Sequence, residues 1–180
     1  ETITGSGTLT LGQSGETIDI PSGVTFDSTG ATVTGALTNT PAFKVTLSSN
    51  QTIAHDTLTR LAWDTEEYDT DNGFNTSTYQ YTIPTGEGGK YFFEYHVFVD
   101  DLDDTDFALA YIETDGVQEV GTIDQRYGSS GTQNTPLSWS GVFTVTAGQT
   151  IEVVTKHGIG SNQEIRSNSS FFAGFKLIGL

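Results

Sequence analysis

The densest set of residues that could do chemistry is a run of five aspartates: Asp100, Asp101, Asp103, Asp104 and Asp106. Carboxylates this close repel one another unless water, salt or a cation neutralises them. Calcium takes about 6–8 oxygen ligands, chiefly carboxylates and carbonyls. The run departs from the EF-hand template, because Asp106 stands where that loop requires glycine. A solvated loop and a calcium site are therefore the two interpretations, and the sequence suggests no other cofactor.

A second acidic cluster lies earlier in the chain. Its members are Asp64, Glu66, Glu67, Asp69 and Asp71. The same two alternatives apply here, and plain solvation is favoured more strongly than for the first cluster.

The residues that could support catalysis form no recognisable motif. His55, His96 and His157 are widely separated in the sequence, and the 23 acidic residues offer many carboxylate pairs without singling one out. The glycine-rich stretch 86–89 lacks the Lys-Ser/Thr of a phosphate-binding loop and precedes an expected strand, so it predicts a turn. The sequence therefore favours a protein that is not an enzyme, with strand-face or surface histidines. A glycan-cleaving enzyme is the weakest of three alternatives.

Four aromatic residues could stack on sugar rings, although core or subunit-interface packing is the favoured interpretation. They are Trp63, Tyr111, Tyr127 and Trp139.

The composition excludes several classes of function. The chain has 180 residues, with 7 Lys and Arg against 23 Asp and Glu, for a net charge of −16. Such a charge disfavours nucleic-acid binding and electrostatic docking on anionic membranes. Cysteine is absent, which excludes disulfides and thiolate chemistry, and no apolar run predicts membrane insertion. The chain starts at Glu1 and contains no Met, so we expect it to be trimmed or part of a longer polypeptide.

The residues after Pro41 predict many short strands and no helix. Turn residues separate apolar stretches at regular intervals, and Asp115-Gly116 between two stretches is a hairpin signal. This pattern is typical of an antiparallel sandwich or barrel. The expected strands are 42–47, 57–63, 78–83, 90–99, 107–113, 117–123, 137–146, 150–156 and 170–178.

Some of these strands are apolar on both faces, notably 107–112 and 171–178. An antiparallel strand with one wet face should alternate apolar and polar residues. In a small sandwich the second apolar face is most simply covered by another subunit. Five aromatic residues are therefore expected to divide between the core and a subunit interface: Phe92, Phe98, Tyr111, Phe172 and Phe175.

Residues 1–40 differ from the rest of the chain. They are rich in Gly, Thr and Ser, contain no Lys or Arg, and carry short alternating pairs such as Leu9 with Leu11 and Ile18 with Ile20. Strands this short need neighbouring chains, as in a fibrous stem. The alternatives are an ordered multi-chain stem, which the alternation favours, and a flexible linker.

Several segments, in order, resemble the globular head of complement component one-q, in the tumour-necrosis-factor-like jelly-roll superfamily. The segment Ala42–Val45 resembles the opening strand, and Tyr79–Pro84 followed by Gly89–Phe93 resembles a strand ending in Pro, a glycine and an aromatic strand. Residues 141–151 resemble the late hairpin and Phe172–Leu177 the closing strand. Residues 1–40 resemble the short-strand stems of bacteriophage fibre and appendage proteins.

The resemblance implies an all-β jelly-roll head (41–180) on an N-terminal fibrous stem (1–40). Some heads of this family bind calcium. The favoured function is a non-enzymatic, homotrimeric virion protein, an appendage or fibre knob for host attachment or a capsid or tail decoration. Its expected partners are other virion proteins and a host-surface glycan or protein, and its location is the virion. The alternative is a secreted lectin-like module of a larger extracellular protein.

Overall fold

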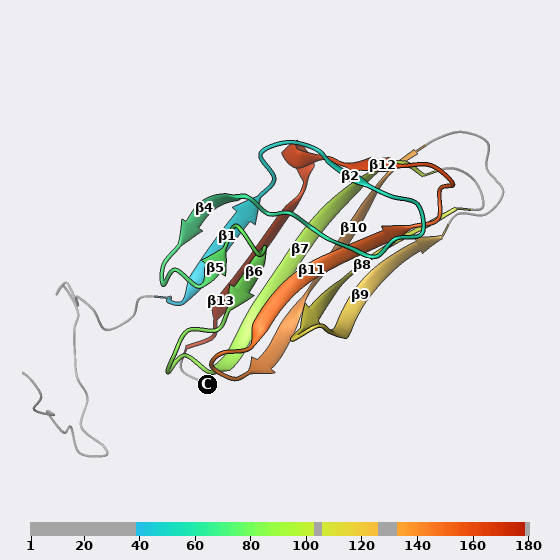
Figure 1. The fold of residues 1–180 in the computed structure, drawn as a ribbon. Helices are drawn as coiled ribbons and strands as arrows, with labels where there is room; N and C mark the ends of the chain where they lie inside the picture. The colour runs from blue at the N-terminus through green and yellow to red at the C-terminus, as the bar shows by residue number, and fades with distance from the viewer. Residues whose placement is uncertain (1–38, 103–105, 126–132, 179–180) are drawn as a thin grey trace, which may run out of the picture. The chain divides into compact units, whose positions relative to one another are not determined.

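The computed structural model describes residues 39–102, 106–125 and 133–178, and within these ranges the chain is all-β. The strands pair antiparallel and form two sheets that pack face to face (Figure 1). A short 3₁₀ turn, Ser167–Ser169, interrupts the strands near the end of the chain. The jelly-roll sandwich that the sequence predicts is confirmed.

Seven of the described strands form the first sheet, here called sheet I. Its centre is the long strand β7, which pairs with β10, β12 and β13, while β1 lies between β13 and β4. The strands are β1 (Ala42–Thr46), β2 (Gln51–Ile53), β4 (Thr65–Asp69), β7 (Gly89–Leu102), β10 (Gln133–Val145), β12 (Gln163–Ile165) and β13 (Phe171–Lys176).

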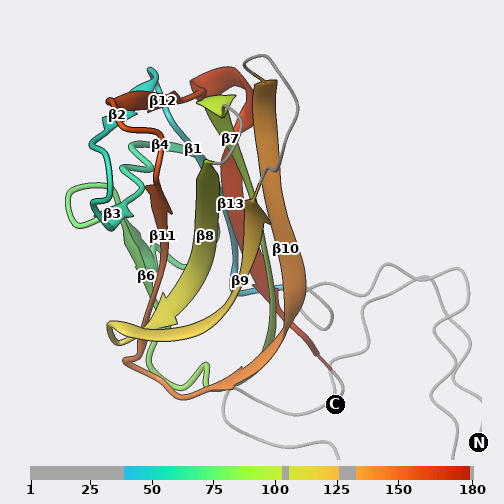
Figure 2. The same ribbon diagram turned by 90° about the vertical axis from the view of Figure 1, so that its right-hand side faces the viewer.

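Six of the described strands form the other sheet, sheet II, in which β11 is central. Figure 2 shows β11, β8 and β9 in one layer and β13, β7 and β10 in the other. The strands are β3 (Thr59–Arg60), β5 (Phe74–Asn75), β6 (Gln80–Thr82), β8 (Phe107–Thr114), β9 (Val117–Gln125) and β11 (Thr150–His157).

An aromatic core fills the space between the sheets. Phe43 of β1 stacks on Tyr81 of β6 with ring centroids 4.1 Å apart, and meets Phe172 of β13 edge-on at 5.0 Å. These rings are fully buried, as is Trp63. Tyr95 of β7 donates its hydroxyl to the carbonyl oxygen of Ala110 at 2.6 Å, which ties sheet I to sheet II. Burial of this much aromatic surface is the main driving force for the fold.

The hairpin between β8 and β9 follows the sequence prediction. Asp115 and Gly116 both have positive φ, 52° and 76°, the conformation that a tight two-residue hairpin turn requires. Each of the nine expected strands has an observed counterpart, although β3 and β6 are shorter than predicted. Four short or acidic strands were not predicted: β2, β4, β5 and β12. The fibrous stem predicted for residues 1–40 lies outside the described residues except for 39 and 40, and its boundary stays a prediction.

Candidate functional site

The outer face of sheet I carries partly exposed aromatic side chains. Along β7 every second residue is fully buried in the core, while Phe92, Glu94, His96 and Phe98 are half-buried and face outward. Phe92 lies opposite Phe175 of β13, with ring centroids 5.3 Å apart. On its other side Phe92 pairs with Val142 of β10, which is 53% exposed. We call these residues, with Phe171 of β13, the aromatic face.

Polar groups occupy the middle of the aromatic face. The ring of His96 stacks on Phe171 at 6.1 Å, and its Nδ1 lies within hydrogen-bond distance of the carbonyl oxygen of Ser169. The ammonium of Lys44 lies 5.5 Å from the centre of the Phe171 ring and also pairs with Glu67 at 2.9 Å. The face therefore has apolar flanks and a hydrogen-bonding centre, whereas most protein interfaces have an apolar centre and a polar rim.

The five aromatic residues singled out in the sequence occupy three positions. Phe172 is fully buried in the core. Phe92, Phe98 and Phe175 lie on the outer side of sheet I, where the guanidinium of Arg166 covers the Phe98 ring at 5.5 Å. Tyr111 lies on the outer side of sheet II, away from the other four. Of the other candidate aromatics, Trp63 is in the core, Trp139 packs against the core, and Tyr127 lies outside the described residues.

The outer face of sheet II carries a cluster of paired charges beside apolar side chains. Glu152 of β11 is 2% exposed and forms an ion pair with the Nε of Arg60 on β3. Glu113 of β8 lies directly across the ladder from Glu152. Burial, together with a hydrogen bond to Glu152 and its charge, raises the pKa of the Glu113 carboxyl, while Arg60 opposes this shift. The two carboxyls and the guanidinium form one coupled cluster, which we call the carboxyl pair.

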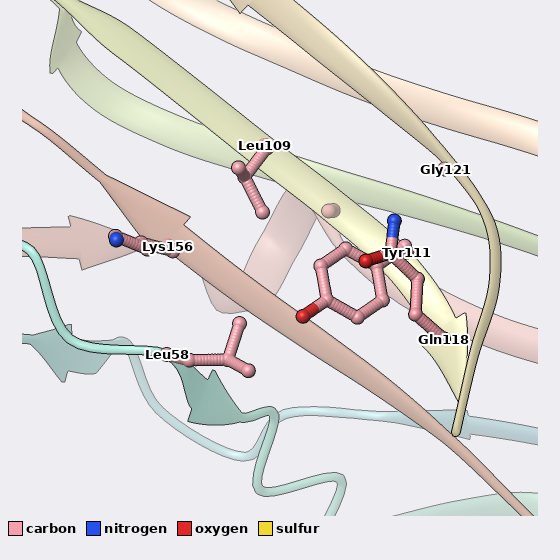
Figure 3. A pocket seen from close by; sticks show the side chains of 7 residues that line it. Leu58, Leu109, Tyr111, Gln118, Gly121 and Lys156 are labelled. Atoms are coloured by element: carbon pink, nitrogen blue, oxygen red, sulfur yellow. The ribbon is translucent and has the colours of Figure 1, made fainter. Parts of the chain in front are cut away.

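A hollow of about 440 Å³ lies beside the carboxyl pair on the same face. Figure 3 shows Tyr111, Leu109 and Leu58 around it, with Lys156 toward one end and Gln118 toward the other. Gly121 of β9 pairs with Tyr111 and also lines the hollow. A Cβ at position 121 would stand 2.3 Å from the Cβ of Tyr111, so the bare glycine leaves the tyrosine its space.

The aspartate run is only partly described. Asp100 follows Phe98 as the next half-buried residue of β7, and it forms an ion pair with the Nε of Arg166. Asp106 precedes β8 and is half-buried, whereas Asp103, Asp104 and the side chain of Asp101 lie outside the described residues. Among the described side chains, no three His, Asp or Glu residues gather as metal ligands. The calcium site therefore stays a prediction.

Members of the second acidic cluster make local hydrogen bonds. Asp64 accepts bonds from the backbone nitrogen of Ser48, at 2.7 Å, and from its hydroxyl. Partial burial raises the pKa of Asp64, but these Ser48 bonds outweigh it and leave the pKa below its usual value. Asp69 accepts a 2.7 Å bond from the backbone nitrogen of Phe74. These carboxylates orient the turns at the ends of β4.

Two of the three histidines come together, which the sequence did not indicate. The rings of His55 and His157 lie 6.5 Å apart. His157 is 1% exposed, and its Nε2 lies 3.0 Å from the carbonyl oxygen of Ile53. His157 is therefore a strand-face residue, one of the two predicted alternatives, and its face of β11 is the buried one. His96 lies on a strand face as predicted.

The fold, but not a sequence family, is found among known proteins. No family model matches the chain, and the curated proteins give no match. Among solved structures, the chain is similar to the globular domain of zebrafish complement 1qA protein, with a TM-score of 0.54 and 18% identity over 76% of this chain and 97% of that one. The chain thus has the jelly-roll fold of complement one-q globular domains.

No described helix is long and apolar enough to cross a membrane.

Proposed function

We propose that the chain is a non-enzymatic, homotrimeric head that assembles through its aromatic face and serves as a virion appendage for attachment to a host. The observation that carries the proposed assembly is the partly exposed apolar set of Phe92, Phe171, Phe175 and Val142 on the outer side of sheet I. Apolar surface of this kind gains about 25 cal/mol per Å² when water is removed from it. A second and third copy of the chain are its proposed cover.

The fold supports the number of subunits. Globular domains of the complement one-q type typically form trimers. Glu94 and His96 at the polar centre of the face would have to hydrogen-bond across the copies or to trapped water, because the centre of an interface is usually depleted of charged residues. A short-strand stem in residues 1–40 would also need several chains side by side. The fold and the stem independently favour the same assembly.

The appendage role rests on the resemblance of the stem to phage fibres and on the placement of loops. A jelly roll holds its loops at the two ends of a rigid sandwich, and loops on rigid scaffolds carry recognition. Three heads that bind together raise the overall affinity of a weak contact by orders of magnitude. The net charge of −16 disfavours attraction to an anionic envelope, so recognition needs specific contacts to a host glycan or protein.

The competing roles are passive capsid or tail decoration and a secreted lectin-like module. The genes that flank the coding sequence separate the secreted module from both virion roles. Phage structural genes on both sides are expected. A signal peptide encoded upstream, without such neighbours, would contradict the proposal.

Competition with the virion tests attachment directly. Purified full-length trimer, added in excess to the host cells before infection, should reduce virion adsorption. A heat-denatured sample is the control. A trimer that neither binds the cells nor slows adsorption would leave only the decoration role.

A further inference from the structure

The hollow on sheet II has the dimensions of a small-molecule site. Its volume of about 440 Å³ falls within the range of about 300–1,000 Å³ typical of ligand pockets. Tyr111 and Leu109 come from β8, Lys156 from β11, and Leu58 from the segment before β3. It lies on the opposite sheet from the aromatic face, and all its residues belong to one protomer. Assembly through sheet I would therefore leave it open.

The lining combines one aromatic ring with separate polar groups. Tyr111 and Leu58, which is 46% exposed, supply apolar surface, and Figure 3 shows both side chains beside the same open space. The amide of Gln118 both donates and accepts hydrogen bonds, and the ammonium of Lys156 donates them. A flat ring beside scattered donors and acceptors suits a ligand with an apolar face and polar edges.

The charges around the hollow decide against an anionic ligand. Lys156 is the one cation in the lining, and its ammonium lies 2.7 Å from the carboxylate of Asp56. Farther along the same face, the single cation Arg60 stands against the two carboxyls Glu113 and Glu152. The charges around the hollow thus sum to neutral or negative, and the whole chain has a net charge of −16. A phosphate, sulfate or carboxylate group would be repelled.

We propose that this hollow binds a neutral pyranose ring, with the apolar face of the sugar stacked on Tyr111 and its hydroxyl groups hydrogen-bonded to Gln118 and Lys156. A pyranose has one face of C–H groups and a rim of hydroxyls, which matches this lining. The inference names a ligand class for the head, but it rests on the hollow alone and not on the trimer or the virion. Binding of a single ring should be weak, with a Kd on the order of millimolar.

Nuclear magnetic resonance of the full chain with carbon-13-labelled tyrosine tests the proposal. The chain has seven tyrosines, and the signal lost in Tyr111→Phe assigns the ring. The probes are the methyl glycosides of glucose, galactose, mannose and N-acetylglucosamine. At least one should shift the Tyr111 signal in a saturable way. The Tyr111→Ala and Leu58→Ser variants should weaken that binding about tenfold or more, whereas Tyr68→Ala, at an exposed tyrosine of β4, should leave it unchanged.

Three outcomes would overturn the proposal: no glycoside of the panel shifts the Tyr111 signal, both hollow variants retain full binding, or the methyl glycoside of N-acetylneuraminic acid binds more tightly than every neutral sugar. Leu58→Ser keeps the test valid if Tyr111→Ala fails to fold, because Leu58 is outside the core. A monomeric chain that still binds the sugar would contradict the proposed assembly and leave this site intact. A trimer without sugar binding would do the reverse.

Discussion

The outer faces of the two sheets share a backbone pattern but differ in side-chain chemistry. On β7 of sheet I and β8 of sheet II, buried and half-buried residues alternate along the strand. The half-buried set on β7 includes Phe92 and Phe98, with Phe175 beside it on β13. On sheet II the corresponding positions include Tyr111 and Glu113, beside the buried Glu152.

On the proposals above, this difference separates assembly on sheet I from ligand binding on sheet II. The rings of the aromatic face are apolar surface, which gains free energy when other copies of the chain cover it. On sheet II the charged groups Arg60, Glu113 and Glu152 already pair with one another, so this part of the face gains little from a protein cover. The face keeps instead a small hollow open to water. The two proposals together assign one task to each outer surface of the sandwich.

The largest expected effect contrasts two phenylalanines of β13. Phe172→Ala removes a fully buried core ring and should lower the free energy of unfolding by about 3–5 kcal/mol, at any protein concentration. Phe175→Ala lies on the aromatic face, so its effect should grow with protein concentration, as assembly adds to stability. Denaturant unfolding at two concentrations measures both. Equal, concentration-independent losses would contradict the division into core and interface.

The next effect concerns the ion pairs of the two faces. Arg60→Met leaves the buried carboxylate of Glu152 without its cation, and should cost about 1–3 kcal/mol. Lys44→Met removes an exposed pair with Glu67 and should cost about 0–1 kcal/mol. Chemical denaturation of both variants at pH 7 gives the comparison. If Lys44→Met lowered the free energy of unfolding as much as Arg60→Met, burial of Glu152 would not be the reason that its ion pair stabilises the fold.

The carboxyl pair should make stability depend on pH. The pKa of Glu113 is raised in the folded state by burial and by Glu152, so folding favours its protonated form. The stability that Glu113 contributes is complete below the pKa it has in the unfolded chain. It is lost as the pH rises through the higher pKa it has in the folded chain. Glu113→Gln stays neutral at every pH and so avoids this loss of stability. It should raise the melting temperature more at pH 7 than at pH 4.

Asp115, in the hairpin turn of the same sheet, should make stability depend on pH in the opposite direction. Hydrogen bonds from the backbone of Thr150 and the side chain of Gln149 lower its pKa, so its contribution is present at neutral pH and lost as the pH falls. Asp115→Asn should therefore flatten the acid limb of the stability curve. If Glu113→Gln and Asp115→Asn both kept the pH dependence of the wild-type melting temperature, the pKa shifts assigned to Glu113 and Asp115 would be refuted.

The smallest effect is expected at the aspartate run. Arg166 already engages Asp100, which favours a solvated loop over a calcium site. Chelation with EDTA should then leave the melting temperature unchanged, and Asp106→Asn should be neutral or mildly stabilising. A melting temperature that falls on chelation and recovers with added calcium would establish the site, because a ligand of the folded state adds stability.

The sequence predicted the long strands well and the short ones poorly. Strands β7, β8, β10 and β13 carry enough alternating apolar residues to reveal both their position and their outward aromatics. The two- and three-residue strands show no period, and β4, with the sequence TEEYD, is almost wholly exposed and was interpreted as a solvated acidic cluster. Tertiary pairing with β1, not local pattern, makes β4 a strand.

The sites on sheet II depend on strand register, which a single sequence does not give. Glu113 meets Glu152 only because β8 and β11 pair in one register, and Tyr111 borders the hollow only because Leu58, Gln118 and Lys156 converge there. The His55 and His157 rings meet for the same reason. Of these residues only Tyr111 was singled out from the sequence, which favoured packing in the core or a subunit interface over sugar stacking.

The molar mass of the full chain in solution tests the central claim most directly. Light scattering at micromolar concentration should give three times the 19.3 kDa chain mass. Phe92→Glu, which places a charge in the aromatic face, should give a folded monomer, while Val117→Glu, at an exposed position of sheet II, should remain trimeric. A monomeric wild-type chain, or a Phe92→Glu variant that is still trimeric, would contradict assembly through sheet I.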